Sequence, residues 1–273
     1  MTVQEQTTPT TQADDVLQYE VNDGIATIWL NRPHKRNCIN WDLLMKLGEA
    51  FNRAEDDDDA RVVVIRGRGG TFCAGADLDM LDEEFLATTN NSIKIARISA
   101  ETFGRAFNLA KPTIAAVEGY AVAGGFELSI STDFLIAADD AKIGDFHIRR
   151  ALFGGAGPIY RVPRMIGIRK TKELMLTGKR LSGKEAVDFD LINASAPAEA
   201  LDELVKDFIA PLIDKSPFAM RLTKMTIDRG LDADIQSLMV MEHLAVGNAL
   251  QSEDAREGVN AFLEKREPKW VGR

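Results

Sequence analysis

The feature that most constrains the fold is residues 61–70, RVVVIRGRGG, a continuous run of β-branched side chains that ends in glycines. A run that is apolar at every position, rather than at every second one, is typical of a strand buried on both faces of a parallel sheet. Two further apolar runs, 112–122 (PTIAAVEGYAV) and 134–144 (FLIAADDAKIG), predict one more strand each. Residues 17–30 break at Asn22-Asp23-Gly24 and predict a hairpin of two strands.

Helical patterns lie between and after these strands. Apolar residues recur at helical spacing over 42–58, about 80–110 and 124–132, and this alternation predicts α/β architecture. No strand is predicted after residue 157; helices are expected at 168–178, at 182–190, at 197–213 and twice more through residue 265. Ser182 and Glu185 form a capping box. The expected organisation is a disordered tail over 1–15, an α/β core over 16–195 and a helical region over 196–273.

Composition narrows the classes of function. The formal net charge of −9 over 273 residues argues against a nucleic-acid surface, although a local basic patch can still bind a polyanion. Cys38 and Cys73 have neither zinc-ligand spacing nor the density of a disulfide framework, which favours reduced thiols in a cytoplasmic protein. The first 15 residues lack the basic start and apolar core of a signal peptide, and no apolar stretch is long enough for a membrane span.

Two glycine-rich segments follow strands and expose backbone amides. They are 71–80, TFCAGADLDM, and 118–133, EGYAVAGGFELSISTD. The first alone is also typical of a plain turn. In the second, a helix begins at glycines, where free N–H groups attract negative charge. Two such donors aimed at one carbonyl oxygen form an oxyanion hole. Glu127, in the first helical turn, is either a surface glutamate that the helix dipole stabilises or a catalytic carboxylate.

The segment 141–150, AKIGDFHIRR, contains one of only three histidines. Taken alone, His147 is consistent with a core histidine bonded to a backbone carbonyl, and Asp145, Arg149 and Arg150 with solvated charges. Residues 154–157, GGAG, are not a Walker loop because no Lys-Ser or Lys-Thr follows them, and the chain has no GxGxxG fingerprint.

Six segments in a fixed order resemble the crotonase (enoyl-CoA hydratase/isomerase) superfamily over about residues 17–268. They are LNRPHKRNCIN, FCAGADLDML, GYAVAGGFELSISTDFLIAADDAKIG, GGAGPIYRVPRMIG, LTGKRLSGKEA and EGVNAFLEKREP. The resemblance implies a spiral of repeated ββα units with a helical C-terminal region. It implies an acyl-CoA substrate, no metal and no cofactor beyond the coenzyme A of that substrate, and a homotrimer or a dimer of trimers. Neither nucleic acid nor membrane is an expected partner.

The resemblance also assigns roles to single residues. By motif match, the amides of Ala76 and Gly124 form the oxyanion hole. Lys35 and the backbone of Ala74, Ala76 and Leu78 match positions that contact CoA. Phe262 and Lys265 match positions that reach CoA, commonly on a neighbouring subunit, and the C-terminal helices match the subunit contact. Residues 79–100 are expected to line the acyl pocket.

The acid–base positions depart from the family pattern. Glu127 fills the first catalytic position, but His147 stands where hydratases have a second glutamate, and Asp145 falls at a glutamine position. Gly155 occupies the place of the acidic residue that dienoyl-CoA isomerases need, and Ala123 replaces a usual glycine. The favoured interpretation is an enoyl-CoA hydratase in which Glu127 activates water and His147 exchanges the α-proton. The alternatives are a crotonase-type hydrolase or isomerase, or a non-catalytic acyl-CoA binder.

Overall fold

The main sheet of the computed structural model has six strands in the order β1-β2-β3-β4-β6-β8. The model describes residues 15–273, except the side chains of Glu84 and Phe85, so the tail predicted over 1–15 falls outside the described residues but for residue 15. The antiparallel hairpin of β1 (Leu17–Asn22) and β2 (Ile25–Leu30) and the buried strand β3 (Val62–Gly67) confirm the predictions made from sequence. From β2 onward, all neighbours pair in parallel: β4 (Thr113–Val117), β6 (Phe134–Ala138) and β8 (Ala194–Ala196).

A second, smaller layer of strands lies beside the main sheet. It contains β5 (Tyr120–Val122) and β7 (Lys142–Gly144), extended by single bridges from Cys73 to Ala121 and from Ile143 to Leu181. The prediction of one strand each over 112–122 and 134–144 was therefore wrong, because each run forms two strands in two sheets. At the first break, Gly119 has a φ of 58°, and this left-handed turn takes the chain out of the main sheet.

Each helix after a strand pair completes a repeating ββα unit, as the family resemblance implied. After β3 and the bridged segment 73–77 come α2 (Leu78–Met80), a π-helical turn (Leu81–Phe85) and α3 (Thr89–Asn108), so the helix predicted over 80–110 is interrupted. The pairs β4–β5 and β6–β7 are followed by α4 (Gly124–Ser129) and, after the 3-10 turn η3 (His147–Arg150), by α5 (Pro158–Thr177). The turn η1 (Pro33–Lys35) and α1 (Trp41–Asp56) follow the first hairpin. The apolar faces of the sheets and helices form one continuous core.

Residues after 157 differ from prediction in two ways. The strand β8 was missed, since its sequence Ala-Ser-Ala has no apolar run and its position depends on pairing with β6. Helix α5 begins ten residues before the predicted 168 and is broken at Gly167, which has a φ of 75°. The capping box of Ser182 and Glu185 at α6 (Gly183–Asp188) is confirmed. After η4 (Ala198–Ala200), α7 (Leu201–Ile213) packs against β3, β6 and β8.

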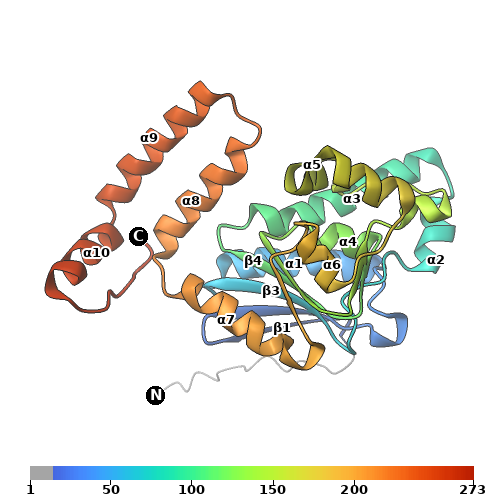
Figure 1. The fold of residues 1–273 in the computed structure, drawn as a ribbon, viewed down its shortest axis with the longest axis horizontal. Helices are drawn as coiled ribbons and strands as arrows, with labels where there is room; N and C mark the ends of the chain where they lie inside the picture. The colour runs from blue at the N-terminus through green and yellow to red at the C-terminus, as the bar shows by residue number, and fades with distance from the viewer. Residues whose placement is uncertain (1–14) are drawn as a thin grey trace, which may run out of the picture.

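The last helices form an arm that stands away from this body (Figure 1). The arm contains three helices, α8 (Pro217–Gly230), α9 (Ile235–Gln251) and α10 (Glu253–Glu264), where two were predicted. No residue of α9 is buried, although its sequence is rich in apolar side chains such as Ile235, Leu244 and Leu250. Over the described residues, no helix is both long and apolar enough to cross a bilayer.

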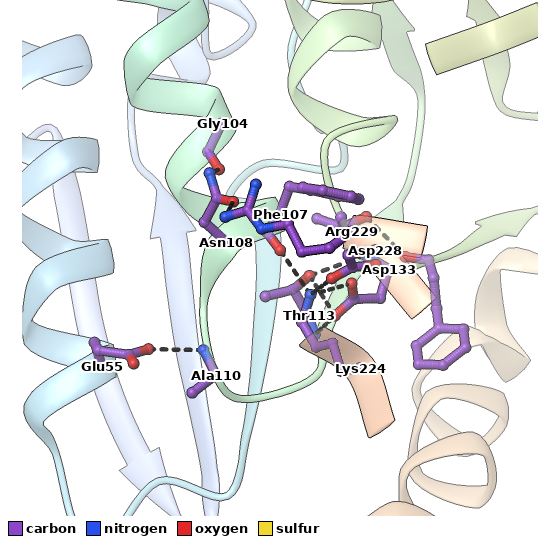
Figure 2. A network of polar contacts seen from close by, with 12 residues as sticks. Glu55, Gly104, Phe107, Asn108, Ala110, Thr113, Asp133, Lys224, Asp228 and Arg229 are labelled. Carbon is purple, nitrogen blue, oxygen red and sulfur yellow. Dashed lines mark hydrogen bonds and ion pairs between the residues drawn. The ribbon is translucent and has the colours of Figure 1, made fainter. Parts of the chain in front are cut away.

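A half-buried polar cluster anchors the arm to the body (Figure 2). The Lys224 ammonium group of α8 donates to the Phe107 carbonyl at 2.6 Å, to Asp133 at 2.6 Å and to Asp228 at 2.9 Å. Asp133, in turn, accepts hydrogen bonds from both the backbone and the hydroxyl of Thr113 at the start of β4. Charged groups that are largely removed from water are stabilised by such pairing and hydrogen bonding. The cluster therefore fixes the middle of α8 on the body.

Candidate active site

Two backbone amides, those of Ala76 and Gly124, lie side by side where the bridged segment 73–77 meets the start of α4. A Cβ placed on Gly124 would lie 3.6 Å from the Ala76 nitrogen, and one on Gly75 would lie 3.6 Å from the Gly124 nitrogen. The bridge between Ile39 and Ala76 uses the carbonyl of Gly75 and the amide of Asp77, so the Ala76 N–H points the other way. Within residues 15–273, neither amide donates to a protein group. Both N–H groups are therefore available to one acceptor.

Glycines allow the backbone of residues 70–73, just before the bridged segment, to pack closely against neighbouring backbone. A Cβ on Gly125 would lie only 2.1 Å from the Cys73 carbonyl oxygen, and one on Gly119 would lie 2.5 Å from that of Gly70. A Cβ on Gly67 would lie 1.9 Å from the carbonyl oxygen of Thr71. Real Cβ atoms do not approach backbone oxygens this closely, so the position of residues 70–73 depends on the absence of side chains around it.

Ala123, which stands where the family pattern has a glycine, adopts a strained backbone conformation. Its φ of 51° and ψ of −123° lie in a region that side chains disfavour. Its N–H donates to the Gly144 carbonyl at 3.3 Å, and the turn still begins α4 at Gly124.

The Glu127 carboxylate lies one turn into α4, in the interior of the protein. Only 5% of Glu127 is exposed, and its Oε1 accepts a hydrogen bond from the Ala156 amide at 2.9 Å. Burial raises the pKa of Glu127 to about 7, against the opposing effects of the His147 charge and the amide hydrogen bonds. A carboxyl group with a pKa near neutrality can both take and release protons under physiological conditions. Sequence reasoning missed the Ala156 donor, which comes from a loop 29 residues further along the chain.

His147 lies beside Glu127 but bonds directly to Asp145. The His147 Nδ1 and an Asp145 oxygen are 2.9 Å apart, and the side chains are 14% and 4% exposed. The interpretation of Asp145 as a solvated charge was therefore wrong, because residue 145 ends in the interior after β7. Burial lowers the pKa of His147, but the Asp145 hydrogen bond and the charges of Glu127 and Asp145 outweigh it and leave that pKa above its usual value. Arg149 and Arg150 are exposed, as expected.

Gly154 lies between the two acidic groups. A Cβ at Gly154 would be 2.9 Å from Asp145 Oδ1 and also 2.9 Å from Glu127 Oε1. Both carboxylates thus lie next to Gly154 in the loop 154–157. Ala156, two residues further along the same loop, donates its N–H to Glu127. The carboxylates of Glu127 and Asp145 and the ring of His147 form one group, which we call the acid–base cluster.

The expected CoA-contacting residues fall into two separate places. Lys35 lies near the segment after Ala76, with its ammonium 3.7 Å from Asp77 and 3.5 Å from Asp79. Ala74 donates its N–H to the Arg36 carbonyl at 3.1 Å, and Leu78 is 74% exposed. Phe262, which is 83% exposed, and Lys265 instead lie at the C-terminal end of α10 on the arm, away from α4 (Figure 1). One chain does not bring the two groups together.

Comparison with known proteins identifies the family. Residues 20–273 match the family described as enoyl-CoA hydratase/isomerase. The chain belongs to the enoyl-CoA hydratase/isomerase family. Enoyl-CoA hydratase domain-containing protein 2, mitochondrial, of Bos taurus is 37% identical over 257 residues, covering 92% of this chain and 86% of its own.

Other members of the enoyl-CoA hydratase/isomerase family agree in sequence and in fold. The crotonyl-CoA hydratase of Syntrophomonas wolfei is 31% identical over 255 residues, covering 93% of this chain and 97% of its own. A crystal structure of an enoyl-CoA hydratase from Bacillus anthracis superposes with a TM-score of 0.89 at 32% identity and covers 94% of this chain and all of its own. The chain thus has the crotonase fold and is an enzyme of this family.

Proposed function

We propose that the protein catalyses the reversible addition of water to a 2-enoyl-CoA thioester. The observation that carries this proposal is the placement of a buried carboxylate, whose pKa is about 7, next to a half-buried imidazole and close to the helix start that presents the Gly124 amide. Hydration needs these parts: donors for a thioester enolate, a group that takes a proton from water and a group that gives one to carbon. The names of the relatives, among them a crotonyl-CoA hydratase and a short-chain-enoyl-CoA hydratase, support the same reaction.

Each step uses a residue of this chain. The Glu127 carboxylate takes a proton from water as the water oxygen bonds to the β-carbon of the enoyl group. The electrons of the carbon–carbon double bond move toward the thioester, and its oxygen accepts hydrogen bonds from Ala76 and Gly124. The α-carbon then takes a proton from the His147 imidazolium. Water has been added as hydroxyl and hydrogen, and the proton on Glu127 returns to His147 before the next turnover.

The same proposal includes the binding of CoA and the assembly. Lys35, with the backbone of Ala74, Ala76 and Leu78, contacts the CoA moiety, and no further cofactor takes part. Phe262 and Lys265 reach CoA on a neighbouring subunit of a homotrimer or a dimer of trimers. The remoteness of α10 from α4 and the exposed apolar side chains of α9 support an assembly of this kind. We expect the enzyme to act in the cytoplasm.

The test is the loss of enoyl absorbance with a panel of short, long and cyclic enoyl-CoA substrates. His147→Ala should lower turnover at least about a hundredfold, the usual scale for a general acid or base, while the affinity for CoA persists. Thioester cleavage, followed as released thiol, would replace the hydratase proposal by a hydrolase. Double-bond migration without hydration would indicate an isomerase, and binding without turnover on any substrate would indicate an acyl-CoA binder.

A further inference from the structure

Asp145 is a buried carboxylate for which the steps above have no use. Only 3% of the residue is exposed, although burying an ionised group without compensation costs several kcal/mol. Its Oδ1 bonds to Nδ1 of His147 at 2.9 Å, and its backbone carbonyl accepts the His147 N–H at 2.8 Å. Two separate hydrogen bonds therefore join the same pair of residues.

The backbone between the two residues brings their side chains together. Phe146 has a φ of 61° and a ψ of −15°, a left-handed conformation that is uncommon for a residue with a side chain. It turns the chain sharply between β7 and η3, so that Asp145 and His147 meet in the interior. The strain at Phe146 is consistent with a functional constraint on this geometry.

The chemistry of the bond fixes which ring nitrogen carries a proton. An ionised carboxylate only accepts hydrogen bonds, so the bond to Asp145 requires the proton on His147 Nδ1. In the neutral ring, Nε2 is then the bare nitrogen, and only this atom can take a proton from carbon or return one. Without the carboxylate, a neutral imidazole is free to adopt the opposite tautomer.

We propose that Asp145 is a positioning residue that keeps the proton of His147 on Nδ1 and so reserves Nε2 for proton exchange with the substrate α-carbon. The proposal rests on the function proposed above, since it deepens the role of His147 in that reaction.

The groups that face His147 support this role. The carboxylates of Asp145 and Glu127 favour the imidazolium, and burial opposes it. The pKa of His147 is consequently above its usual value while that of Glu127 is about 7. The proton that returns from Glu127 to His147 after each turnover thus passes between two groups whose pKa values are both raised.

The kinetic test measures the effect of Asp145→Asn twice, once in the native protein and once in a His147→Ala background. An asparagine at 145 can donate to Nδ1 and so move the ring proton to Nε2; we expect kcat to fall at least about a hundredfold with little change in KM. The alkaline limb of the pH profile should move to lower pH because a carboxylate that favours imidazolium has been removed. In a His147→Ala background, Asp145→Asn should change kcat by less than about twofold. An equal loss in both backgrounds overturns the proposal.

A second measurement does not need turnover. NMR of protein with isotopically labelled histidine rings distinguishes the two tautomers, and the His147 signal among the three histidines is the one missing from His147→Ala. At a pH above the pKa of His147, where the ring is neutral, we expect the proton on Nδ1 in the native protein and on Nε2 in Asp145→Asn, at unchanged thermal stability of the fold. Exposed Asp58→Asn serves as the charge-matched control and should change neither signal nor rate. A neutral ring protonated on Nε2 in the native protein overturns the proposal. The expected tautomers without enoyl-CoA turnover sustain the role of Asp145 in placing the ring proton and refute only the hydratase function.

Discussion

The two sides of the candidate active site are built in opposite ways. The donor side consists of the amides of Ala76 and Gly124, which are held by strand bridges and by glycines pressed against backbone oxygens. The acid–base cluster consists of side chains, each of which depends on its neighbours for its position and its charge. Backbone amides do not titrate, whereas the carboxyl group of Glu127 and the imidazole of His147 do.

This difference separates two tasks. The donor side can stabilise an enolate whatever the side chains at 76 and 124 are, as long as the backbone path is kept. The cluster decides where protons go, so a change in one member alters the others through charge and tautomer. Substitutions on the donor side should therefore lower the rate by displacing backbone, without changing the shape of the pH profile. Substitutions in the cluster should lower the rate by changing proton transfer, and should alter the pH profile.

The largest effect is expected for Glu127→Gln. An amide cannot take a proton from water, so kcat should fall about a thousandfold. At pH 8 the same variant should be more stable to unfolding, on the order of 2 kcal/mol, because it removes a charge that burial disfavours. Enoyl-CoA turnover and urea unfolding measure the two effects. Exposed Glu49→Gln, as a control, should change neither, and a less stable Glu127→Gln protein at pH 8 would contradict the account of burial.

Gly125→Ala should damage the donor side through shape alone. Its Cβ would meet the Cys73 carbonyl oxygen at 2.1 Å, so the segment before Ala76 must move. Misplacing one oxyanion donor costs on the order of a hundredfold in kcat. The shape of the pH profile should stay the same, which separates this variant from those in the cluster. Gly104→Ala is the matched control, since nothing lies within 4 Å of its Cβ.

The rate of the native enzyme should depend on pH, changing by about tenfold per pH unit on the acidic and alkaline limbs of its profile. Activity in hydration needs ionised Glu127, whose pKa is about 7, and protonated His147, whose pKa is raised. The profile of kcat/KM should be a bell with one limb set by Glu127 and the other by His147. Stability follows the raised pKa of Glu127: its contribution is present below pH 4.5 and is lost as pH rises through 7. A rate that is flat between about pH 6 and 9 would count against the cluster.

Ala123→Gly should give the smallest effect. Glycine relieves a strain of about 1–3 kcal/mol at the positive φ. Its greater conformational freedom in the unfolded chain lowers the free energy of unfolding by about 0.4–1 kcal/mol. We expect a gain of about 1 kcal/mol in the free energy of unfolding, with a nearly unchanged rate. Ala121→Gly, in a buried strand, is the control and should lower stability. A large change in kcat would show that the strain itself tunes the donor side.

Sequence reasoning succeeded where a local pattern fixes the outcome. The hairpin at 17–30 has a turn sequence, β3 has an uninterrupted β-branched run, and Ser182 and Glu185 cap a helix through contacts three residues apart. It failed at β8 and at Asp145. The small residues of β8 become a strand only by pairing with β6, and Asp145 is buried only because distant segments close over it.

The glycine contacts around residues 70–73 also predict how the gene tolerates random mutation. In a library of substitutions scored for activity, Gly67, Gly119 and Gly125 should be among the least tolerant positions, although none carries a reactive group. Almost any base change in the first two positions of their codons introduces a side chain where there is no room for one. The backbone path of the proposed donor side is thus specified genetically by what those positions must lack.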